Sequence, residues 1–298
     1  MATNRIISIS SVPYDGYEFP RALESLAACA VTHVEPAFII GYSGPIDDGD
    51  FTAAKAGQYS AWLADAGIAC HAFSAHNIQF DRADVVDIYR GRMDFAAGMG
   101  ARIINVTAAA RADSAAYFRQ IDVIARHAEQ LGIMIGLENP GDGQDNLINT
   151  AADGIALLEK LGHDCIRLNY DAGNTISHRP LGAQGGVDPV VDALLAMPYC
   201  GHVHIKDVHV GNDGRYFFTA IGKGDIDCAT IVHAVAKTDL NLTIEMPLRL
   251  HRLANKKPQR RSEPLPLAEI ESAIRESLRF VERHLAIGNA SSAPAKIG

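Results

Sequence analysis

Eight short runs rich in β-branched and other apolar residues recur along the chain at a nearly constant interval, and this period constrains the fold more than any other feature. The runs are Arg5–Ser10, His33–Phe38, Ile68–Phe73, Arg102–Thr107, Ile133–Glu138, Ile166–Asp171, Gly201–Lys206 and Leu242–Glu245. Their first residues lie 28 to 41 positions apart, which leaves room for one crossover helix after each strand. We therefore expect eight parallel βα units, the number that closes a (β/α)8 barrel of the α/β class.

The segments between these runs carry apolar residues at helical spacing, as at Tyr117, Ile121 and Ile124. Glycines follow several of the segments, as is typical of helix C-termini: Gly67, Gly100, Gly132 and Gly162. A doubly wound open sheet is the alternative architecture, and it usually has a glycine-rich phosphate-binding turn after its first strand. Residues 11–15 read Ser-Val-Pro-Tyr-Asp instead, so the sequence favours the closed barrel.

The chain of 298 residues shows no internal linker or second domain, and we expect one barrel over residues 1–287. Residues 288–298 are small and polar and are predicted to form a flexible C-terminal tail. The connection 247–266, after the eighth strand, is long and basic. It contains Arg249, Arg252, Lys256, Lys257, Arg260 and Arg261. Connections of this length are usually functional or disordered, and the sequence leaves the role of this one open.

Charge and composition exclude several functional classes. The formal net charge of −8 argues against nucleic acid as the main partner. The five cysteines form no C-x-x-C pair and are odd in number, which is typical of reduced thiols in a cytoplasmic protein. The N-terminus has no apolar signal region, and no apolar run approaches the roughly 20 residues that span a bilayer. We expect a soluble protein that binds no membrane.

Four consecutive predicted strands end in a side chain that can bind a metal ion. The residues are Glu138, Asp171, His204 and Glu245, at separations of 33, 33 and 41 that match the βα repeat. Because barrel active sites form at the C-terminal ends of the strands, these four side chains are predicted to converge on one point. A single carboxylate at such a position often only caps a helix or pairs with an arginine. Four metal-binding side chains at the ends of four successive strands favour a metal site.

Three carboxylates and one imidazole suit one divalent cation of the borderline-to-hard kind: Mn²⁺, Mg²⁺, Co²⁺ or Zn²⁺. The predominance of oxygen ligands favours Mn²⁺ or Mg²⁺, and we take Mn²⁺ as the first expectation. No cysteine is among the candidate ligands.

The seventh run, His202-Val-His204-Ile-Lys206, places His202, His204 and Lys206 on one face, because strand side chains alternate. His204 lies nearer the C-terminal end and is the better ligand, so His202 is predicted to be a buried hydrogen-bonded residue one layer below. Lys206, at the mouth, either holds a substrate oxyanion or helps to move a proton. The alternative is a solvated lysine paired with a nearby acid.

After the third run, His76 is a candidate to touch substrate or to act as a general acid, and the alternative is that it only caps a loop. His71 is a weaker candidate for such a role. Trp62, the single tryptophan, has helical spacing with Tyr59 and is expected in the core.

At these residues the chain resembles the xylose isomerase-like barrels, which include sugar phosphate isomerase/epimerases, ketose 3-epimerases, inosose dehydratases and the endonuclease IV family. The matching pieces are Leu137-Glu138-Asn139, Asp171-Ala-Gly-Asn174, His202-Val-His204-Ile-Lys206-Asp207, Gly222-Lys-Gly224-Asp-Ile226-Asp and Ile244-Glu245. The resemblance implies the same four metal ligands. It also implies that Glu138 and Glu245 exchange protons with the carbon beside a carbonyl, through an enediolate.

The resemblance implies a small carbohydrate substrate (a sugar, keto-sugar or polyol), with Asn139 and Asn174 as candidates to bind it. Arg249, four residues after the last metal ligand, is a further candidate to clamp a phosphate, a carboxylate or a sugar hydroxyl. Barrels of this group commonly pair. A homo-oligomer or a complex with a small partner subunit therefore stays open.

The leading hypothesis is a metal-dependent isomerase or epimerase. The alternative is a lyase or dehydratase that eliminates a leaving group from a 3-keto-sugar, a keto-glycoside (as C-glycoside deglycosidases do) or a cyclitol, because both reactions begin with the same proton abstraction. A nuclease like endonuclease IV is disfavoured, because the histidine of its sixth strand is replaced by Asn174. A barrel that only binds a ligand is disfavoured by the intact pair Glu138 and Glu245. Ketose 3-epimerases often have a histidine near Asn174, and some relatives have one at the position of Pro140, so those sugar contacts do not transfer.

Overall fold

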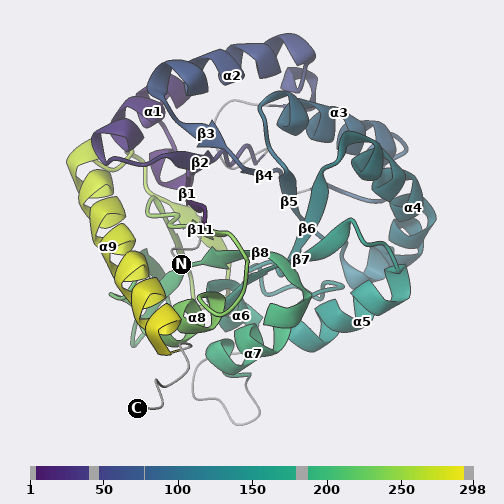
Figure 1. Ribbon diagram of the computed structural model, residues 1–298. Coiled ribbons are helices and arrows are strands. Elements are labelled where there is room, and N and C mark those ends of the chain that lie inside the picture. Colours follow the sequence, from purple (N-terminus) through teal and green to yellow (C-terminus); the bar gives the residue numbers. More distant parts are fainter. Residues whose placement is uncertain (1–4, 40–46, 77, 179–186, 292–298) are drawn as a thin grey trace, which may run out of the picture.

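The computed structural model describes residues 5–39, 47–76, 78–178 and 187–291, and these form a (β/α)8 barrel as the sequence predicts (Figure 1). The strands form one parallel sheet in the order β3-β2-β1-β11-β8-β7-β6-β5-β4. Their bounds are β1 Ile7–Ser10, β2 His33–Glu35, β3 Ala69–Cys70, β4 Ala72–Ser74, β5 Ile103–Thr107, β6 Met134–Glu138, β7 Ile166–Asp171, β8 Cys200–Ile205 and β11 Leu242–Ile244.

The third predicted strand is divided at His71 into β3 and β4, and this division is where the barrel closes. β3 pairs with β2, whereas β4 pairs with β5. A bridge between Ala37 and Ser74 joins the two edges, with the Phe38 amide donating to the Ser74 carbonyl at 3.0 Å. The two short strands therefore act as one of eight barrel strands.

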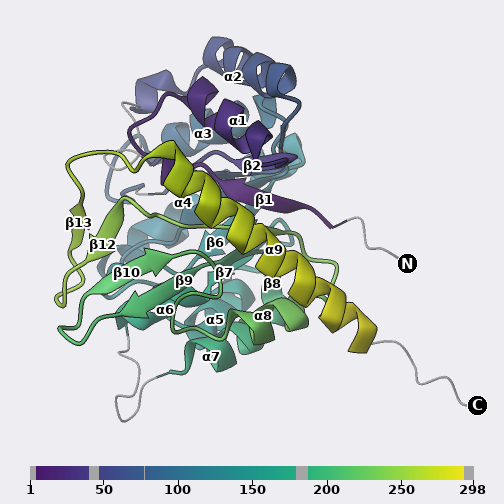
Figure 2. The ribbon, with the colours of Figure 1, turned by 90° about the vertical axis from the view of Figure 1, so that its left-hand side faces the viewer.

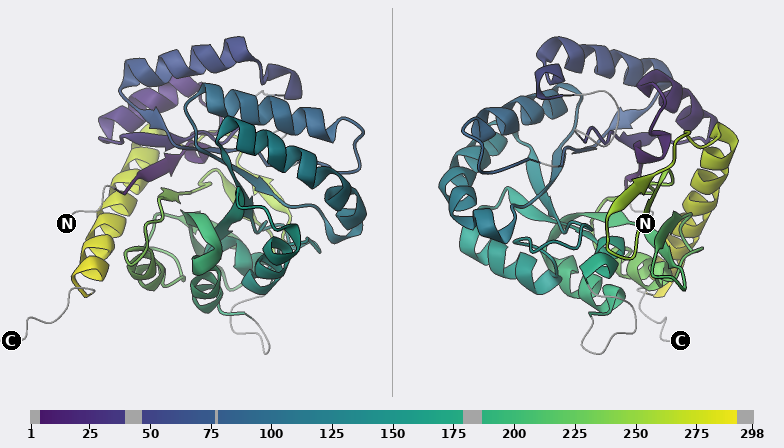
Figure 3. Two further views of the ribbon diagram at one scale, coloured as in Figure 1. Left: turned by 45° about the vertical axis from the view of Figure 1, so that its right-hand side comes forward. Right: turned by 180° about the vertical axis from the view of Figure 1, so that it is seen from behind.

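Helices surround the strands in a ring that is visible from several directions (Figures 1 and 3). Their bounds are α1 Phe19–Ala28, α2 Ala53–Ala66, α3 Val85–Gly98, α4 Ser114–Leu131, α5 Ala151–Leu161, α6 Ala172–His178, α7 Pro189–Ala196, α8 Cys228–Val235 and α9 Leu267–Ser291. In α4 the predicted stripe Tyr117, Ile121 and Ile124 is buried against the sheet. The Trp62 ring packs against the core and meets Tyr59 edge-on, as expected.

Three of the helices end at a glycine in the left-handed conformation, which glycine adopts without steric cost. Gly67, Gly132 and Gly162 have φ values of 66°, 63° and 65°. The last helix, α9, continues through Ser291, so residues 288–291, which the sequence assigns to the tail, belong to the helix. The rest of the predicted tail, 292–298, lies outside the described residues.

A second, smaller sheet is built from the connections that follow β8 and β11 (Figure 2). It is antiparallel, in the order β13-β12-β10-β9, with β9 Asp207–Val210, β10 Tyr216–Thr219, β12 Leu250–Arg252 and β13 Pro258–Arg260. The long basic connection 247–266 is thus an ordered hairpin that pairs with β10. No helix among the described residues has the length and apolarity needed to cross a membrane.

Candidate metal centre and active site

The four predicted metal ligands meet at the C-terminal end of the barrel. Glu138, Asp171 and His204 come from β6, β7 and β8, and Glu245 directly follows β11. The register of the sheet sets Asp171 beside His204, and the Glu245 amide continues the ladder by donating to the Ile205 carbonyl at 3.0 Å. One ligand atom from each of the four lies within 4.8 Å of the others, and all four residues are buried. Strand register alone therefore gathers the ligand set.

The geometry of this cluster fits a metal ion better than a set of hydrogen bonds. His204 Nδ1 lies 3.2 Å from Glu138 Oε2 and 3.1 Å from Glu245 Oε2, yet it makes no hydrogen bond. Asp171 Oδ2 and Glu245 Oε2 are also buried and accept no well-aligned hydrogen bond, although Lys206 Nζ lies 2.7 and 2.9 Å from them. Buried polar atoms are rarely left in this way. Their lone pairs converge on one space, as ligands of a cation do.

Electrostatics in the cluster also call for added positive charge. Burial, followed by the repulsion from Glu245 and Glu138, raises the pKa of Asp171 to about 7 against the attraction of Lys206. Burial opposes ionisation of Glu245 as well, but Lys206 and His204 hold its pKa at about 2. His204 and His76 likewise hold the pKa of Glu138 below its usual range despite burial. The positive neighbours therefore favour the ionised form of both glutamates, which is the form that can accept a proton.

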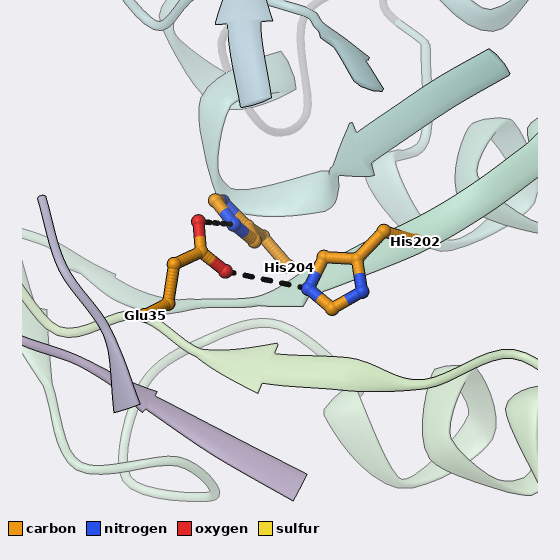
Figure 4. A group of neighbouring side chains, drawn as sticks. All are labelled: Glu35, His202 and His204. Atoms are coloured by element: carbon orange, nitrogen blue, oxygen red, sulfur yellow. Dashed lines mark hydrogen bonds and ion pairs between the residues drawn. The ribbon is translucent and has the colours of Figure 1, made fainter. Parts of the chain in front are cut away.

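Glu35, a residue that the sequence analysis missed, supports His204 from below. Its side chain comes from β2, is fully buried, and directs one carboxylate oxygen to the ring of His202 and the other to the ring of His204 (Figure 4). His204 Nε2 is 2.9 Å from Glu35 Oε1, and His202 Nε2 is 3.3 Å from Glu35 Oε2. A carboxylate that accepts the Nε2 proton fixes the tautomer and leaves the Nδ1 lone pair for a metal.

Further donors surround Glu35 on neighbouring strands. Asn105 Nδ2 donates to it at 2.9 Å, Thr243 Oγ1 donates at 2.5 Å, and the Ser74 hydroxyl also donates. Burial would raise the pKa of Glu35, but His204 and His202 hold it well below its usual range. Glu35, His202 and His204 also form a geometrically possible second metal group. Because their facing atoms are hydrogen bonded to one another, we assign them to the support of the first site.

Lys206 is buried beside the ligands, as the face of β8 predicts. Its Nζ lies 2.7 Å from Asp171 Oδ2 and 2.9 Å from Glu245 Oε2, and donates to Asn174 Oδ1 at 3.1 Å. Burial would lower the pKa of Lys206, but Asp171 and Glu245 raise it above its usual value. Of the alternative considered, a solvated lysine paired with a nearby acid, the solvation is wrong because this ammonium group is enclosed, whereas the pairing with acids is present.

Two of the remaining candidates, Asn174 and His76, contact Glu138, and two histidines lie elsewhere. Asn174 Nδ2 donates to Glu138 Oε1 at 2.8 Å, which brings Asn174 to the site. His76 Nε2 is 3.3 Å from Glu138 Oε2, while its buried Nδ1 has no hydrogen-bond partner. His202, as predicted, lies one layer below and contacts Thr243 Oγ1 at 2.9 Å. His71 is not brought to the site; its Nε2 contacts Asn241 Nδ2 at 2.9 Å.

Two candidates for substrate binding are not brought to the cavity. Asn139 is fully buried, donates to the Asp171 carbonyl at 2.8 Å and accepts from the Asp171 amide at 2.9 Å. Asn139 therefore fixes the backbone of Asp171, one of the candidate metal ligands, and its side chain lies too deep to contact a sugar. Arg249 donates to the carbonyls of Arg261, Asp15 and Ser262 at 3.1, 3.0 and 2.7 Å. Its guanidinium is used to anchor the connection 247–266.

A cavity of about 400 Å³ opens above the ligand cluster, within the size range of small-molecule sites. Glu138 and Glu245 line its inner end together with His76, Asn174 and Lys206. The outer wall comes from the second sheet and the loop after β6. It includes Gly141, Asp142, Gln144, Asn146, Phe218, Arg252, Asn255, Lys256, Lys257 and Pro258.

Comparison with known proteins places these features in a family. The sequence model of the family described as xylose isomerase-like TIM barrel matches residues 23–284. The chain is 31% identical to an L-ribulose 3-epimerase of Mesorhizobium japonicum over 112 residues, which are 38% of this chain and 33% of that protein. The match thus spans about a third of that relative's length.

Two solved structures share the fold over nearly their whole length. A xylose isomerase-like TIM barrel protein of Mycobacterium smegmatis, in complex with magnesium, superposes with a TM-score of 0.70 at 16% identity, covering 96% of this chain and 98% of that one. A D-allulose 3-epimerase of Methylomonas sp., in complex with D-allulose, gives a TM-score of 0.65 at 16% identity, covering 94% and 97%. At these identities the likeness establishes the fold.

Proposed function

The chain belongs to the xylose isomerase-like TIM barrel family, and we propose that it is a metal-dependent isomerase or epimerase that moves a proton beside the carbonyl group of a sugar or keto-sugar. The observation that carries the proposal is the convergence of Glu138, Asp171, His204 and Glu245 within 4.8 Å, at the inner end of a cavity. The epimerase activity of the partial sequence relative agrees with this choice.

One divalent ion would be held by these four side chains, and Mn²⁺ is our first choice because three of them supply oxygen. The magnesium complex of one structural neighbour agrees with a hard divalent cation. When bound, the ion would act as a Lewis acid that stabilises the negative charge developing on the substrate oxygens.

The two cavity-lining glutamates are placed to move the proton. They come from β6 and from the end of β11, and β7 and β8 lie between these strands in the sheet. A sugar above the cluster therefore has one carboxylate on each side of its reacting carbon. We propose that ionised Glu245 takes the proton from carbon and leaves an enediolate. Glu138 takes up a proton from solvent in the cavity and gives it to the opposite face of the carbon, and Glu245 then releases its proton to solvent, which restores both carboxylates.

Three neighbours complete the proposed chemistry. Lys206 and His76 present positive or hydrogen-bonding groups at the inner end of the cavity, where they would hold the substrate oxygen that gains charge. Asn174 bridges Glu138 and Lys206 through its amide and would keep both in register while contacting a hydroxyl group. Asn139 acts through Asp171 as a positioning residue.

Solvent exchange at carbon tests the proposal directly. The Mn²⁺-loaded protein is incubated with ketopentoses and ketohexoses in deuterated water, and loss of the C–H signal is followed by proton NMR. We expect Glu245→Gln to reduce exchange at least about a thousandfold, since the base is removed. Glu159→Gln, an exposed site on α5, is the matched control and should exchange as the parent does.

The products distinguish the reaction types. Recovery of a deuterated epimer or aldose supports the proposal, whereas a dehydrated keto product assigns the same site to a lyase. Undiminished exchange in Glu245→Gln would overturn the role of this residue.

A further inference from the structure

The outer end of the cavity has the opposite charge from its inner end. The hairpin formed by β12 and β13 contributes Arg252, Lys256 and Lys257 to the wall, whereas Glu138 and Glu245 line the inner end. A substrate whose carbonyl sits at the metal ligands therefore extends toward a basic wall.

Strand pairing and hydrogen bonds hold the hairpin in place. β12 pairs with both β10 and β13. At the tip, the Lys256 amide donates to the Leu253 carbonyl at 2.8 Å, and the Leu253 amide donates to the Lys257 carbonyl at 3.0 Å. Arg252 Nη1 donates to the Lys256 carbonyl at 2.9 Å. The backbone that carries the basic side chains is therefore preorganised, which lowers the entropic cost of binding.

Lys256 sits at the tip in a strained conformation. Its φ is +69°, a left-handed value that a lysine adopts only at an energetic cost. The loop after β6 packs closely on its side chain, since a Cβ at Gly143 would lie 2.7 Å from Lys256 Cγ. The ammonium group contacts the Tyr216 hydroxyl and lies 4.3 Å from the centre of that ring. Strain, packing and the tyrosine together fix this ammonium group at the cavity wall.

Neither lysine of the tip has a carboxylate partner among the ion pairs of residues 5–39, 47–76, 78–178 and 187–291. Asp142 lines the same cavity, but its Oδ1 accepts from the Gln144 amide and from Asn146 Nδ2, each at 2.9 Å. Lys206, by contrast, is paired with two acids. Two cations thus face the cavity without a protein anion to neutralise them.

We propose that Lys256 and Lys257 form a subsite for an oxyanion, a phosphate or a carboxylate group, at the end of the sugar remote from its reacting carbonyl. The proposal rests on the proposed function, because the position of the carbonyl defines which end is remote. Oxyanions bind to preorganised lysines through charge-assisted hydrogen bonds. The natural substrate is accordingly an anionic keto-sugar, which the subsite favours over a neutral sugar by affinity.

Catalytic selectivity provides the first test. Carbon–hydrogen exchange is measured with a ketohexose, its 6-phosphate and the corresponding keto-uronate, using the Mn²⁺-loaded protein. We expect one of the anions to exceed the neutral sugar in kcat/KM by at least about tenfold, because a hydrogen bond to a charged group contributes this much affinity. The anion that is preferred identifies the group, and equal values for all three sugars would overturn the proposal.

Two variants and one control assign the effect to the hairpin. Lys256→Asn keeps a residue that tolerates positive φ, and Lys257→Gln changes an exposed side chain, so both should fold. Each is expected to raise KM for the anionic sugar about tenfold, leaving kcat and the neutral sugar unchanged. Lys237→Gln, an exposed lysine that precedes β11 at the other end of the barrel, is the matched control. Unchanged selectivity in both tip variants contradicts the proposal.

A binding measurement separates this inference from the proposed function. Inorganic phosphate is titrated into the parent and into the Lys256→Asn/Lys257→Gln double variant, followed by calorimetry. Weaker binding to the double variant supports the subsite even if no sugar exchanges its proton, which would refute only the isomerase. Equal affinity for phosphate in the two proteins overturns the subsite even if exchange is observed.

Discussion

Replacing Glu35 by glutamine isolates the role of the carboxylate beneath the metal site. Glutamine keeps the size of the side chain and one oxygen for His204 Nε2, which now lies 2.9 Å from Glu35 Oε1. It removes the negative charge that strengthens this hydrogen bond. A charge-assisted bond contributes about 1.5–3 kcal/mol against about 0.5–1.5 kcal/mol for a neutral one. Because of this loss of roughly 1–2 kcal/mol, His204 Nδ1 becomes a weaker electron-pair donor to the cation.

We therefore expect Glu35→Gln to weaken Mn²⁺ binding about 5- to 30-fold, at about 1.4 kcal/mol for each tenfold change. This range overlaps the loss of about 10- to 100-fold that is typical when such supporting carboxylates are removed. Titration calorimetry with Mn²⁺ at constant pH measures the change, and circular dichroism checks the fold. Ser74→Ala is the control, because it removes a donor to Glu35 without touching His204. A folded Glu35→Gln protein that binds Mn²⁺ as tightly as the parent would refute the reasoning.

Further predictions follow from the same contacts. Asn139→Leu removes both hydrogen bonds to the Asp171 backbone. We expect lower metal affinity, measured by calorimetry, and a free energy of unfolding lower by about 1–3 kcal/mol, measured by urea denaturation. Arg249→Met removes the hydrogen bonds to three carbonyls and should lower the free energy of unfolding by about 2–4 kcal/mol. The KM of an active substrate should stay within about threefold of the parent value, and a large rise in KM would instead support the predicted role of Arg249 in substrate binding. Gly136→Ala places a methyl group 3.1 Å from Asn169 Cβ and against Asn105. We expect a lower free energy of unfolding and slower carbon–hydrogen exchange of the substrate. Chelation of the metal should lower the Tm, and Mn²⁺ should restore it, because an ion bound only by the native state stabilises it.

The sequence predicts the barrel and the convergence of its ligands well, because both follow from period. Strand starts about 33 residues apart imply parallel units, and parallel strands bring their C-terminal ends to one edge. The alternation within β8 also places His202 and Lys206 correctly on the face of His204. These inferences need only spacing and side-chain direction.

Residues whose role depends on depth within the barrel were not predictable in the same way. Asn139 follows Glu138 directly in the chain, yet its side chain turns below the cavity to hold Asp171. Arg249 is close to Glu245 in sequence, but the hairpin carries it away to bind carbonyls of residues 15, 261 and 262. Glu35 ends the second strand in His33-Val-Glu35-Pro36, and a carboxylate at a strand end is a signal of the same kind as those at Glu138, Asp171 and Glu245.

The layer below the metal ligands gives the strongest argument that the barrel is built for chemistry. Barrel interiors are usually filled with branched apolar residues. Here the layer contains Glu35, Asn105, Asn169, His202 and Thr243, all fully buried. Buried charges are costly, and well-packed apolar replacements are often more stable. Oxygen atoms of Asn105 and Asn169 even lack partners. Such a layer is unfavourable for folding alone, but it holds His204 through Glu35 and Glu138 through Asn169. Its polarity is thus explained by the need to aim the ligands, and a variant with an apolar layer should fold more stably and bind metal less tightly.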